Sequence, residues 1–272
     1  MELIAAVLCT RLWALAPAYV TTARSMPRAG NPSDPHPVVI LAGGLGTRIR
    51  HLTPDLPKAL VRVLGEPFAF HQLRLLASQG VQNVVFVIGY RGAQIQDAIG
   101  DGAAFDLRVS YVDEGEQLRG TGGALRFALT SDALPRVFGV LYGDSYLPID
   151  LTRVWEAFAI RDRPALMTVY RNEGRWDASN VVVTDGLVAH YEKSRDTPDH
   201  RIAWIDYGFS MLERDVVERI PASRPADLSD LYTEMSIRGE LAAYEVSERF
   251  FEVGTSTGRA DLERHLAGRP SG

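Results

Sequence analysis

The chain has 272 residues, of which 46% are hydrophobic and 23% are charged, as is usual for a soluble globular protein with one large or two small domains. Its formal net charge of −5 argues against a general nucleic-acid-binding protein, because such proteins usually carry a basic excess. The single cysteine, Cys9, excludes an internal disulfide framework and a cysteine-based zinc site.

The first 36 residues differ in composition from the rest of the chain. Two apolar runs, 3–8 and 12–20, are separated by Arg11, and neither reaches the ~20 residues that a membrane span requires. Glu2 stands where a signal peptide would carry basic residues. We therefore expect residues 1–36 to be a poorly ordered extension with no role at a membrane.

From residue 37 onward, apolar strand-like runs alternate with amphipathic helical segments. The pattern predicts, in chain order, a strand over 38–41, a helix over 67–79, a strand over 84–88, a helix over 93–99, a strand over 107–112, a helix over 122–129 and a strand over 137–141. Repeated strand–helix–strand units with continuously apolar strands indicate a parallel sheet covered by helices. Ligands of such sheets bind beyond the carboxyl ends of the strands.

Beyond residue 151 the pattern is that of strands joined by polar turns. It predicts strands over 165–170, 180–184, 187–192 and 202–211, a helix over 228–238, strands near 241–245 and 250–253, and a last helix around 260–266. The sequence contains no internal repeat. We expect this second half to extend the same sheet rather than to form an independent domain.

The most informative segment is 38–58, VVILAGGLGTRIRHLTPDLPK, in which an apolar strand leads into a glycine-rich loop. The loop carries Gly43, Gly44, Gly46, Thr47 and Arg48. Glycine allows backbone N–H groups to approach an anion closely, and Arg48 and Lys58 can add charge-assisted contacts to phosphate. No P-loop string occurs, and Ile49 stands where a dinucleotide-binding fingerprint needs its third glycine. The segment predicts a polyphosphate-binding site.

This string, G-G-x-G-T-R-I followed by P-K, closely resembles the signature of the sugar-1-phosphate nucleotidyltransferases, or sugar-nucleotide pyrophosphorylases. The resemblance covers roughly residues 38–266 and looks nearest to enzymes that act on heptose, mannose or glucose 1-phosphates. It implies an α/β, Rossmann-like, mostly parallel (mixed) central sheet covered by helices on both faces, which is the GT-A-like nucleotide-diphospho-sugar transferase fold. Within a domain over 37–272, it implies a nucleotide-binding half (37–150) and a sugar-phosphate-binding half (151–272).

Two further motifs resemble those with which the family binds Mg²⁺. Gly143-Asp144 ends an apolar strand, and the resemblance implies that Asp144 is a magnesium ligand. The string F-E-V-G-T at 251–255 resembles the family's late signature, with Glu252 in place of the usual aspartate that supplies the second ligand. One or two carboxylates suffice, because Mg²⁺ also takes oxygens from the triphosphate. Mg²⁺ is therefore the expected cofactor.

The string R-G-T-G-G-A at 119–124 resembles the family's loop against the base and ribose of the nucleotide. Its threonine could also cap the following helix. The nucleotide-binding residues that the resemblance implies are Leu41, Ala42, Gly43, Gly44, Gly46, Thr47, Gly120, Thr121 and Gly122.

The sugar-phosphate side is expected in the second half of the chain. Glu192-Lys193 resembles the family's pair in which the acid accepts from sugar hydroxyls and the lysine pairs with the 1-phosphate. Asp206 falls where the family carries N-x-G, which makes it a candidate sugar contact. Arg175 and Trp176, in a predicted turn, either form a platform for the sugar or pack locally.

We expect from the resemblance a cytoplasmic enzyme that transfers a nucleotidyl group from a nucleoside triphosphate to a sugar 1-phosphate and releases pyrophosphate. Arg48 would stabilise the departing pyrophosphate, and Lys58 the α-phosphate. One alternative is a catalytically silent relative that senses sugar nucleotides. A second alternative, a nicotinamide-dependent oxidoreductase, is disfavoured by the missing third glycine. The sequence leaves the nucleobase and the sugar open.

Overall fold

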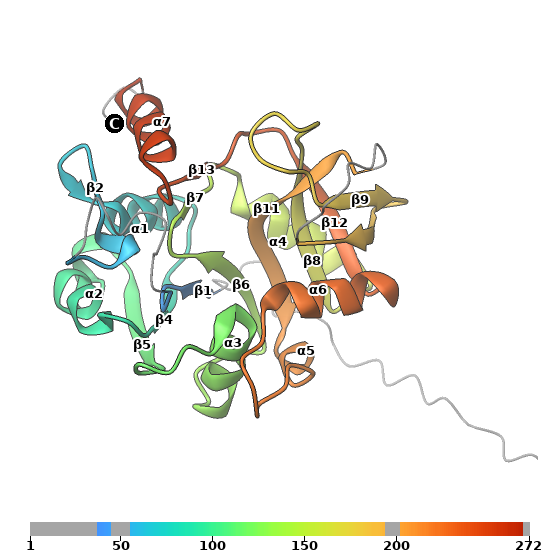
Figure 1. The fold of residues 1–272 in the computed structure, drawn as a ribbon, viewed down its shortest axis with the longest axis horizontal. Coiled ribbons are helices and arrows are strands. Elements are labelled where there is room, and N and C mark those ends of the chain that lie inside the picture. Colours follow the sequence, from blue (N-terminus) through green and yellow to red (C-terminus); the bar gives the residue numbers. More distant parts are fainter. Residues whose placement is uncertain (1–36, 45–54, 194–201, 269–272) are drawn as a thin grey trace, which may run out of the picture.

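The computed structural model describes residues 37–44, 55–193 and 202–268, and its centre is a sheet of nine strands within those ranges (Figure 1). The strands are β1 (Val38–Leu41), β4 (Asn83–Ile88), β5 (Arg108–Asp113), β6 (Val137–Tyr142), β8 (Ala165–Arg171), β9 (Val181–Thr184), β10 (Leu187–Tyr191), β11 (Trp204–Glu213) and β12 (Leu241–Val246). They lie in the order β5-β4-β1-β6-β11-β8-β12-β10-β9. Strands from both halves of the chain therefore share one sheet.

The sheet is mixed. Strands β5, β4, β1 and β6 run parallel, with Val39 of β1 opposite both Val85 and Val140. Strand β11 pairs antiparallel with β6 and β8, whereas β12 is parallel to β8. Strands β9 and β10 form a hairpin whose turn, Asp185-Gly186, has φ angles of 52° and 74°, as a two-residue type I′ turn requires.

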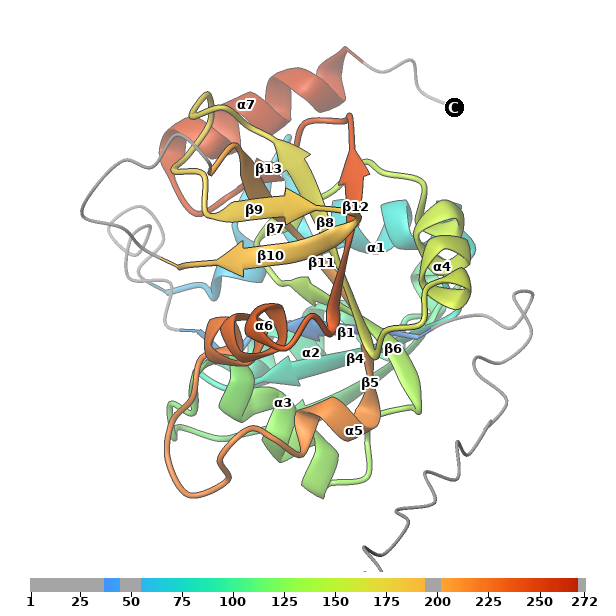
Figure 2. The ribbon, with the colours of Figure 1, turned by 90° about the vertical axis from the view of Figure 1, so that its right-hand side faces the viewer.

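Helices cover both faces of this sheet (Figure 2). On one face lie α1 (Phe68–Ser78), α2 (Gly92–Ile99) and α4 (Leu151–Ile160), and on the other lie α3 (Gly120–Thr130), α5 (Arg214–Val217) and α6 (Leu228–Ile237). Successive residues of β1 point to opposite faces, so Ile40 belongs to the first core and Val39 to the second. Both faces are covered, which explains why this strand is apolar throughout.

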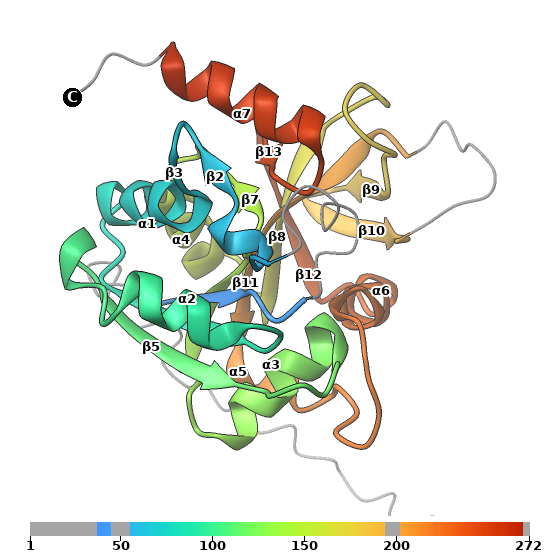
Figure 3. The same cartoon turned by 60° about the vertical axis from the view of Figure 1, so that its left-hand side comes forward.

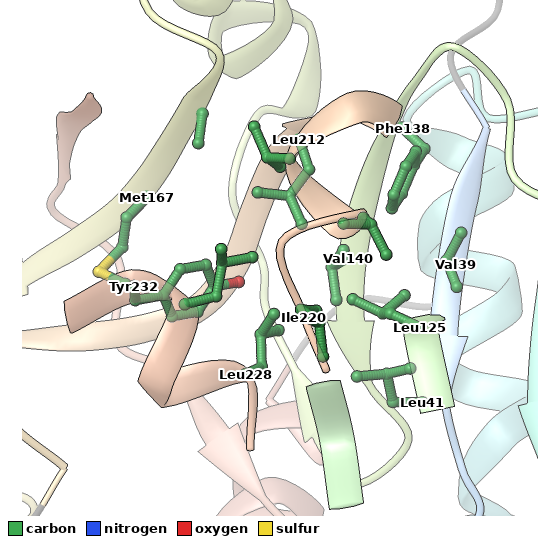
Figure 4. Packing of buried hydrophobic residues seen from close by; sticks show 14 of the residues in the cluster. Val39, Leu41, Leu125, Phe138, Val140, Met167, Leu212, Ile220, Leu228 and Tyr232 are labelled. Carbon is green, nitrogen blue, oxygen red and sulfur yellow. The ribbon is translucent and has the colours of Figure 1, made fainter. Parts of the chain in front are cut away.

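The second core joins the two halves of the chain (Figure 4). Val140 of β6, Met167 of β8 and Leu212 of β11 are almost fully buried in it, together with Tyr232 of α6. The predicted fold class is therefore confirmed by the observed layers.

A third, smaller hydrophobic cluster packs residues 251–262 against residues 63–68 and Tyr146. Two short antiparallel pairs contribute to it, β2 (Arg62–Val63) with β3 (Glu66–Pro67) and β7 (Ser145–Tyr146) with β13 (Phe251–Glu252). Helix α7 (Ser256–Ala267) lies beside β2 and β13 and buries Leu262 there (Figure 3). Short 3₁₀ turns, η1 (Lys58–Leu60) and η2 (Ala103–Phe105), complete the elements of the described ranges. None of the helices described combines the length and the apolar character needed to cross a bilayer.

Most predicted elements are present, and the structure adds α4 over 151–160, a segment for which the sequence analysis predicted no element. The buried residues of this helix, Leu151, Val154, Trp155 and Phe158, recur at helical spacing. The side chain of Asp150 accepts a hydrogen bond from the backbone N–H of Arg153 and begins the helix. The last helix begins at Ser256, four residues earlier than predicted.

Candidate functional site

A cavity of about 420 Å³ lies at the carboxyl ends of the parallel strands. It is lined by residues 41–44 after β1, Glu114 after β5, 142–144 at the end of β6, Lys58 and Ala59 of η1, and residues 118–121 and 124 at the start of α3. This is the edge of the sheet at which a ligand is expected. Leu41, Ala42, Gly43 and Gly44 all border the cavity, whereas Gly46, Thr47 and Arg48 lie outside the described residues.

The ends of β1 and β6 are held close together at the cavity. The backbone N–H of Gly143 donates to the carbonyl of Leu41 over 2.9 Å, and the N–H of Ala42 donates to the carbonyl of Val87 over 2.8 Å. A Cβ atom on Gly43 would clash with Oε1 of Glu114, so a larger residue at this position requires the carboxylate to move. The first glycine of the loop therefore leaves room for a carboxylate as well as for a ligand.

Lys58 and Asp144 form an ion pair at the cavity, although they are far apart in the sequence. The Nζ atom of Lys58 lies 2.5 Å from Oδ2 of Asp144, and the two side chains are 21% and 22% exposed. Gly254 closes over the pair, since a Cβ atom there would lie 3.1 Å from that Nζ. Three motifs singled out in the sequence, P-K, G-D and G-T, thus meet at one point.

Glu252 lies on the strand beside Asp144. In the β7–β13 pair Glu252 stands opposite Ser145, and the N–H of Val253 donates to the carbonyl of Asp144 over 2.9 Å. Within the described ranges, no group of three or more histidine, cysteine or acidic side chains could hold a metal ion by itself. Asp144 lines the cavity, whereas Glu252 lies outside its lining on the strand paired with β7. Carboxylates still suit Mg²⁺, which takes oxygen ligands and completes its shell with phosphate oxygens and water. The magnesium-ligand roles of Asp144 and Glu252 stay a prediction.

Glu114 is a residue of the cavity that the sequence analysis missed. Its side chain is 8% exposed, and Oε2 has no hydrogen-bond partner among the described residues. Burial raises the pKa of this carboxyl to about 7; the positive charge of Arg119 opposes the rise and the negative charge of Asp113 adds to it. A buried carboxylate with an unsatisfied oxygen lines the cavity and can accept hydrogen bonds from a ligand.

The loop at the start of α3 packs against the start of α6. Gly120 has a φ of 74°, and a Cβ atom there would lie 2.4 Å from the carbonyl oxygen of Ala226. Gly122 donates its N–H to that same oxygen over 3.0 Å and does not border the cavity, whereas Gly120 and Thr121 do. The glycines of this loop thus serve close packing between two chain segments.

The expectation that Thr121 caps its own helix is wrong, because no side chain caps α3. Instead, Oγ1 of Thr121 accepts from the N–H of Leu228 over 2.9 Å and donates to Oδ1 of Asp227 over 3.1 Å. Asp227 caps α6 by accepting from the N–H of Ser229 and pairs through its other oxygen with Lys193. Hydrogen bonds from Lys193 and Ser229 outweigh burial and hold the pKa of Asp227 below its usual range. Asp227, which the sequence analysis also missed, thus links the predicted base loop to the predicted sugar-phosphate lysine.

The other predicted sugar residues lie outside the lining of the 420 Å³ cavity, with Glu192 directly after β10 and Asp206 on β11. The N–H of Glu192 donates to the carbonyl of Asn180, and the side-chain oxygen of Asn180 accepts from the N–H of Asp206 over 2.9 Å. Burial raises the pKa of Asp206 to about 6, against hydrogen bonds from Gly208 and Tyr191.

Tyr142 connects the two regions. It borders the cavity, and burial raises the pKa of its hydroxyl, with Asp206 and Asp227 among the negative charges that add to the rise. The bonds of Asp227 to Thr121, which lines the cavity, and to Lys193 place the predicted sugar-phosphate lysine beside the cavity.

Arg175 and Trp176 pack locally. The guanidinium of Arg249 lies 3.6 Å from the ring centroid of Trp176, and Arg175 forms an ion pair with Glu173 over 2.8 Å. Neither residue lines the cavity, so the structure favours local packing over the sugar platform.

The fold and the cavity define an α/β protein with a ligand site at the carboxyl ends of parallel strands, bordered by a glycine loop, a lysine and carboxylates. The family model described as nucleotidyl transferase matches residues 37–185, and the chain belongs to that family. The family membership predicted from the sequence is therefore confirmed.

Several relatives carry the names of sugar-1-phosphate nucleotidyltransferases. The chain is 30% identical over 244 residues to the mannose-1-phosphate guanylyltransferase of Mycobacterium tuberculosis. The aligned region covers 86% of this chain and 66% of the relative. It is 39% identical over 218 residues to a glucose-1-phosphate thymidylyltransferase of Streptomyces griseus, covering 79% of this chain and 57% of the relative. The chain spans 66%, 58% and 54% of the length of three of the curated relatives it matches.

Solved structures show the same fold. HddC from Yersinia pseudotuberculosis matches with a TM-score of 0.70 at 24% identity, covering 85% of this chain and 99% of that one, and a second structure of HddC is complexed with GMP-PN. A putative glucose-1-phosphate thymidylyltransferase from Bacillus anthracis matches with a TM-score of 0.75 at 19% identity, covering 87% of this chain and 97% of that one.

Proposed function

We propose that this protein transfers a nucleotidyl group from a nucleoside triphosphate to a sugar 1-phosphate, giving a nucleoside-diphosphate sugar and pyrophosphate. The observation that carries the proposal is the Lys58–Asp144 ion pair, which stands beside the glycine loop at the carboxyl end of β6. The names of the relatives, which include guanylyl-, thymidylyl- and uridylyltransferases of sugar 1-phosphates, support it. We also propose a cytoplasmic location, because a triphosphate-using enzyme needs its substrate at hand.

The reaction is an in-line displacement at the α-phosphorus. An oxygen of the sugar phosphate forms the new bond to this phosphorus, and the bond to the oxygen that bridges to the β-phosphate breaks, so that pyrophosphate leaves with the electron pair. The attacking oxygen is already anionic, so no general base is needed, and catalysis rests on alignment and on neutralising charge. Lys58 would neutralise the α-phosphate, and Arg48, which lies outside the described residues, would stabilise the pyrophosphate.

Asp144 and Glu252 would hold Mg²⁺, which supplies positive charge between the two anionic reactants when it is bound. In the structure the partner of Asp144 is Lys58. A bound triphosphate offers Lys58 a second anionic partner, so this lysine can turn toward the phosphate while the carboxylate stays at the cavity.

Lys193 would pair with the 1-phosphate of the sugar, and Glu192 and Asp206 would accept from sugar hydroxyls. Lys193 is 61% exposed and is oriented by Asp227. Because the same aspartate also binds Thr121, the sugar-phosphate lysine is tied to the loop that borders the nucleotide cavity.

Among the nucleobases, Glu114 favours guanine. An ionised carboxylate only accepts hydrogen bonds, and its two oxygens match the two adjacent donors, N1–H and the 2-amino group, that guanine presents on its Watson–Crick edge. Uracil and thymine offer a single N–H on this edge, so they would leave one buried oxygen unsatisfied. The guanylyltransferase name of the Mycobacterium tuberculosis relative and the GMP-PN complex of HddC agree with this preference.

The proposed function is tested by pyrophosphate release, with the four nucleoside triphosphates each offered against a panel of sugar 1-phosphates and Mg²⁺. We expect Lys58→Ala to lower kcat by about 10²- to 10³-fold, as loss of a preorganised charge on the reacting phosphate does. Arg153→Ala is the matched control, because Arg153 is 75% exposed on α4 and does not line the cavity.

Undiminished turnover of Lys58→Ala would contradict the mechanism. A wild-type protein that binds nucleotides but releases no pyrophosphate with any pair of substrates would instead favour the silent, sugar-nucleotide-sensing alternative.

A further inference from the structure

Three arginines surround a second, smaller hollow on the face of the sheet that α3 covers. Its volume is about 110 Å³, and Arg119, Arg126 and Arg224 border it, with no aspartate or glutamate in its lining. Figure 1 shows the segment between α5 and α6 passing beside α3, and the hollow lies between them. In a chain with a net charge of −5, this is a local concentration of positive charge.

The hollow is built by well-defined backbone contacts. Arg119 and Arg126 are seven residues apart, so they fall on the same side of α3 two turns from each other. The N–H of Ala226 donates to the carbonyl of Arg119 over 2.9 Å, and this bond fixes the segment that carries Arg224 against the start of the helix. Phe127 forms one wall, with the guanidinium of Arg119 lying 4.5 Å from its ring centroid.

Within the described ranges, the three guanidinium groups lack the acidic partners that most other arginines have. Among the described residues none of the three makes an ion pair, and the buried Nε atoms of Arg119 and Arg126 have no hydrogen-bond acceptor. A buried N–H without an acceptor costs free energy, which a ligand with acceptor oxygens would recover. The planar fork of arginine matches phosphate oxygens in particular. The hydroxyl of Ser223, which also lines the hollow, adds a donor for the same oxygens, whereas that of Thr130 donates to the carbonyl of Phe127 over 2.7 Å.

We propose that this hollow is a second anion site, which binds a phosphate or pyrophosphate group apart from the nucleotide cavity. The ligand is either the pyrophosphate that the proposed reaction releases or the single phosphate group of another metabolite. The apolar wall and the small volume suit such a group rather than a whole nucleotide. Arg119 borders both this hollow and the nucleotide cavity, so the two sites are neighbours.

The test is calorimetric titration of the full chain with inorganic pyrophosphate, and separately with inorganic phosphate, in buffer without Mg²⁺. It is carried out on Lys58→Ala, so that binding at the reaction site is suppressed. We expect this variant to bind pyrophosphate, and a second change, either Arg126→Gln or Arg224→Gln, to weaken that binding at least about tenfold through loss of a charge-assisted contact. Arg153→Gln, which removes the same charge from α4 on the opposite face, is expected to have no effect.

Stronger binding of pyrophosphate than of phosphate would assign the site to the reaction product, and equal binding would assign it to a single phosphate group. The proposal is overturned if Lys58→Ala binds neither anion, or if Arg153→Gln weakens binding as much as Arg224→Gln does. Arg224 is exposed, so its replacement keeps the test valid even if Arg126→Gln folds poorly. The titration measures binding without turnover. If the wild-type protein releases no pyrophosphate in the activity assay, the proposed function is refuted, whereas the anion site is still tested by the titration.

Discussion

Glu114 combines burial, an unsatisfied oxygen and a position at the cavity that we propose binds the nucleotide. Its pKa of about 7 lies above the ordinary value for glutamate, so the carboxyl holds a proton below pH 7 and is ionised above it. Only the ionised form accepts two hydrogen bonds from guanine. Affinity for a guanine nucleotide should therefore be lost as the pH falls through 7.

We predict that GTP binds about tenfold more weakly at pH 6 than at pH 8 for this reason, since the ionised fraction of a group with a pKa of about 7 falls by that factor. Glu114→Gln should remove this difference and narrow the preference for GTP over UTP, because an amide can pair with the adjacent acceptor and donor of uracil. Equilibrium binding of GTP and UTP at pH 6 and pH 8 measures both the pH dependence and the base preference. Any pH dependence that comes from titration of the triphosphate itself is also present in Glu114→Gln, so the difference between the two proteins isolates the effect of Glu114.

Glu116→Gln is the matched control, because Glu116 is exposed and does not line the cavity. A pH dependence that survives in Glu114→Gln would show that another group controls it, and a preference for UTP in the wild type would rule out guanine as the preferred base.

Among individual residues, the sequence predicted those that belong to a motif with several characteristic positions. Lys58 and Asp144 could be named because a glycine loop, a P-K step and a G-D step together carry specific information. Glu114 sits in an ordinary strand-to-turn string, and its burial depends on packing against Gly43, which lies 71 positions earlier and meets it only in the folded chain.

The starts of α3 and α6 form a joint through which two predicted subsites meet. Thr121 comes from the first helix, Asp227 from the cap of the second, and Lys193 from the segment that follows β10. Side-chain bonds at a helix start stabilise it, whereas an exposed ion pair contributes little. Most of the stabilisation by Asp227 should therefore come from its capping bonds.

We predict that Asp227→Ala lowers the free energy of unfolding by about 1–2 kcal/mol, the range for loss of a capping side chain. Asp227→Asn should cost much less, because asparagine is also a good capping residue, although it loses the charge opposite Lys193. Urea denaturation measures both variants, with Asp230→Ala as the control in the first turn of the same helix. If Asn proves as damaging as Ala, the ion pair rather than the cap stabilises the joint.

Element identity was largely predictable from apolar periodicity, as the strands of the parallel region illustrate. Helix α4 was not, because its buried residues follow a strand-rich context and its cap, Asp150, looks like any turn aspartate in the sequence. Thr121 likewise bonds across to α6, and a local capping rule cannot anticipate a partner 107 residues away.

For the molecule as a whole, the decisive feature is the placement of β11 between β6 and β8. It pairs five residues with β6 and continues the sheet into the second half, so the predicted division at residue 150 crosses a continuous hydrogen-bonded layer. The sequence indicated that the second half extends the sheet. It could not supply this antiparallel insertion, because strand order depends on which edges are covered after the chain has collapsed.

This arrangement predicts a single unfolding transition. Val39 and Val140 from the first half share a core with Met167 and Leu212 from the second, so neither half keeps its core when the other unfolds. Three of the four tryptophans lie in the second half, and their fluorescence reports on it, whereas far-UV circular dichroism reports on helices and strands throughout. We expect the two signals to give the same midpoint in urea.

GTP at 100 times its dissociation constant should raise the free energy of unfolding recorded by both probes by about 2.7 kcal/mol, although the proposed base and triphosphate contacts all come from the first half. Two separated midpoints, or a shift confined to one probe, would show that residues 37–150 and 151–272 unfold independently. Coincident shifts would mean instead that a ligand at the end of β1 stabilises β8 and β12 through the shared sheet, because all these strands lose their pairing in one step.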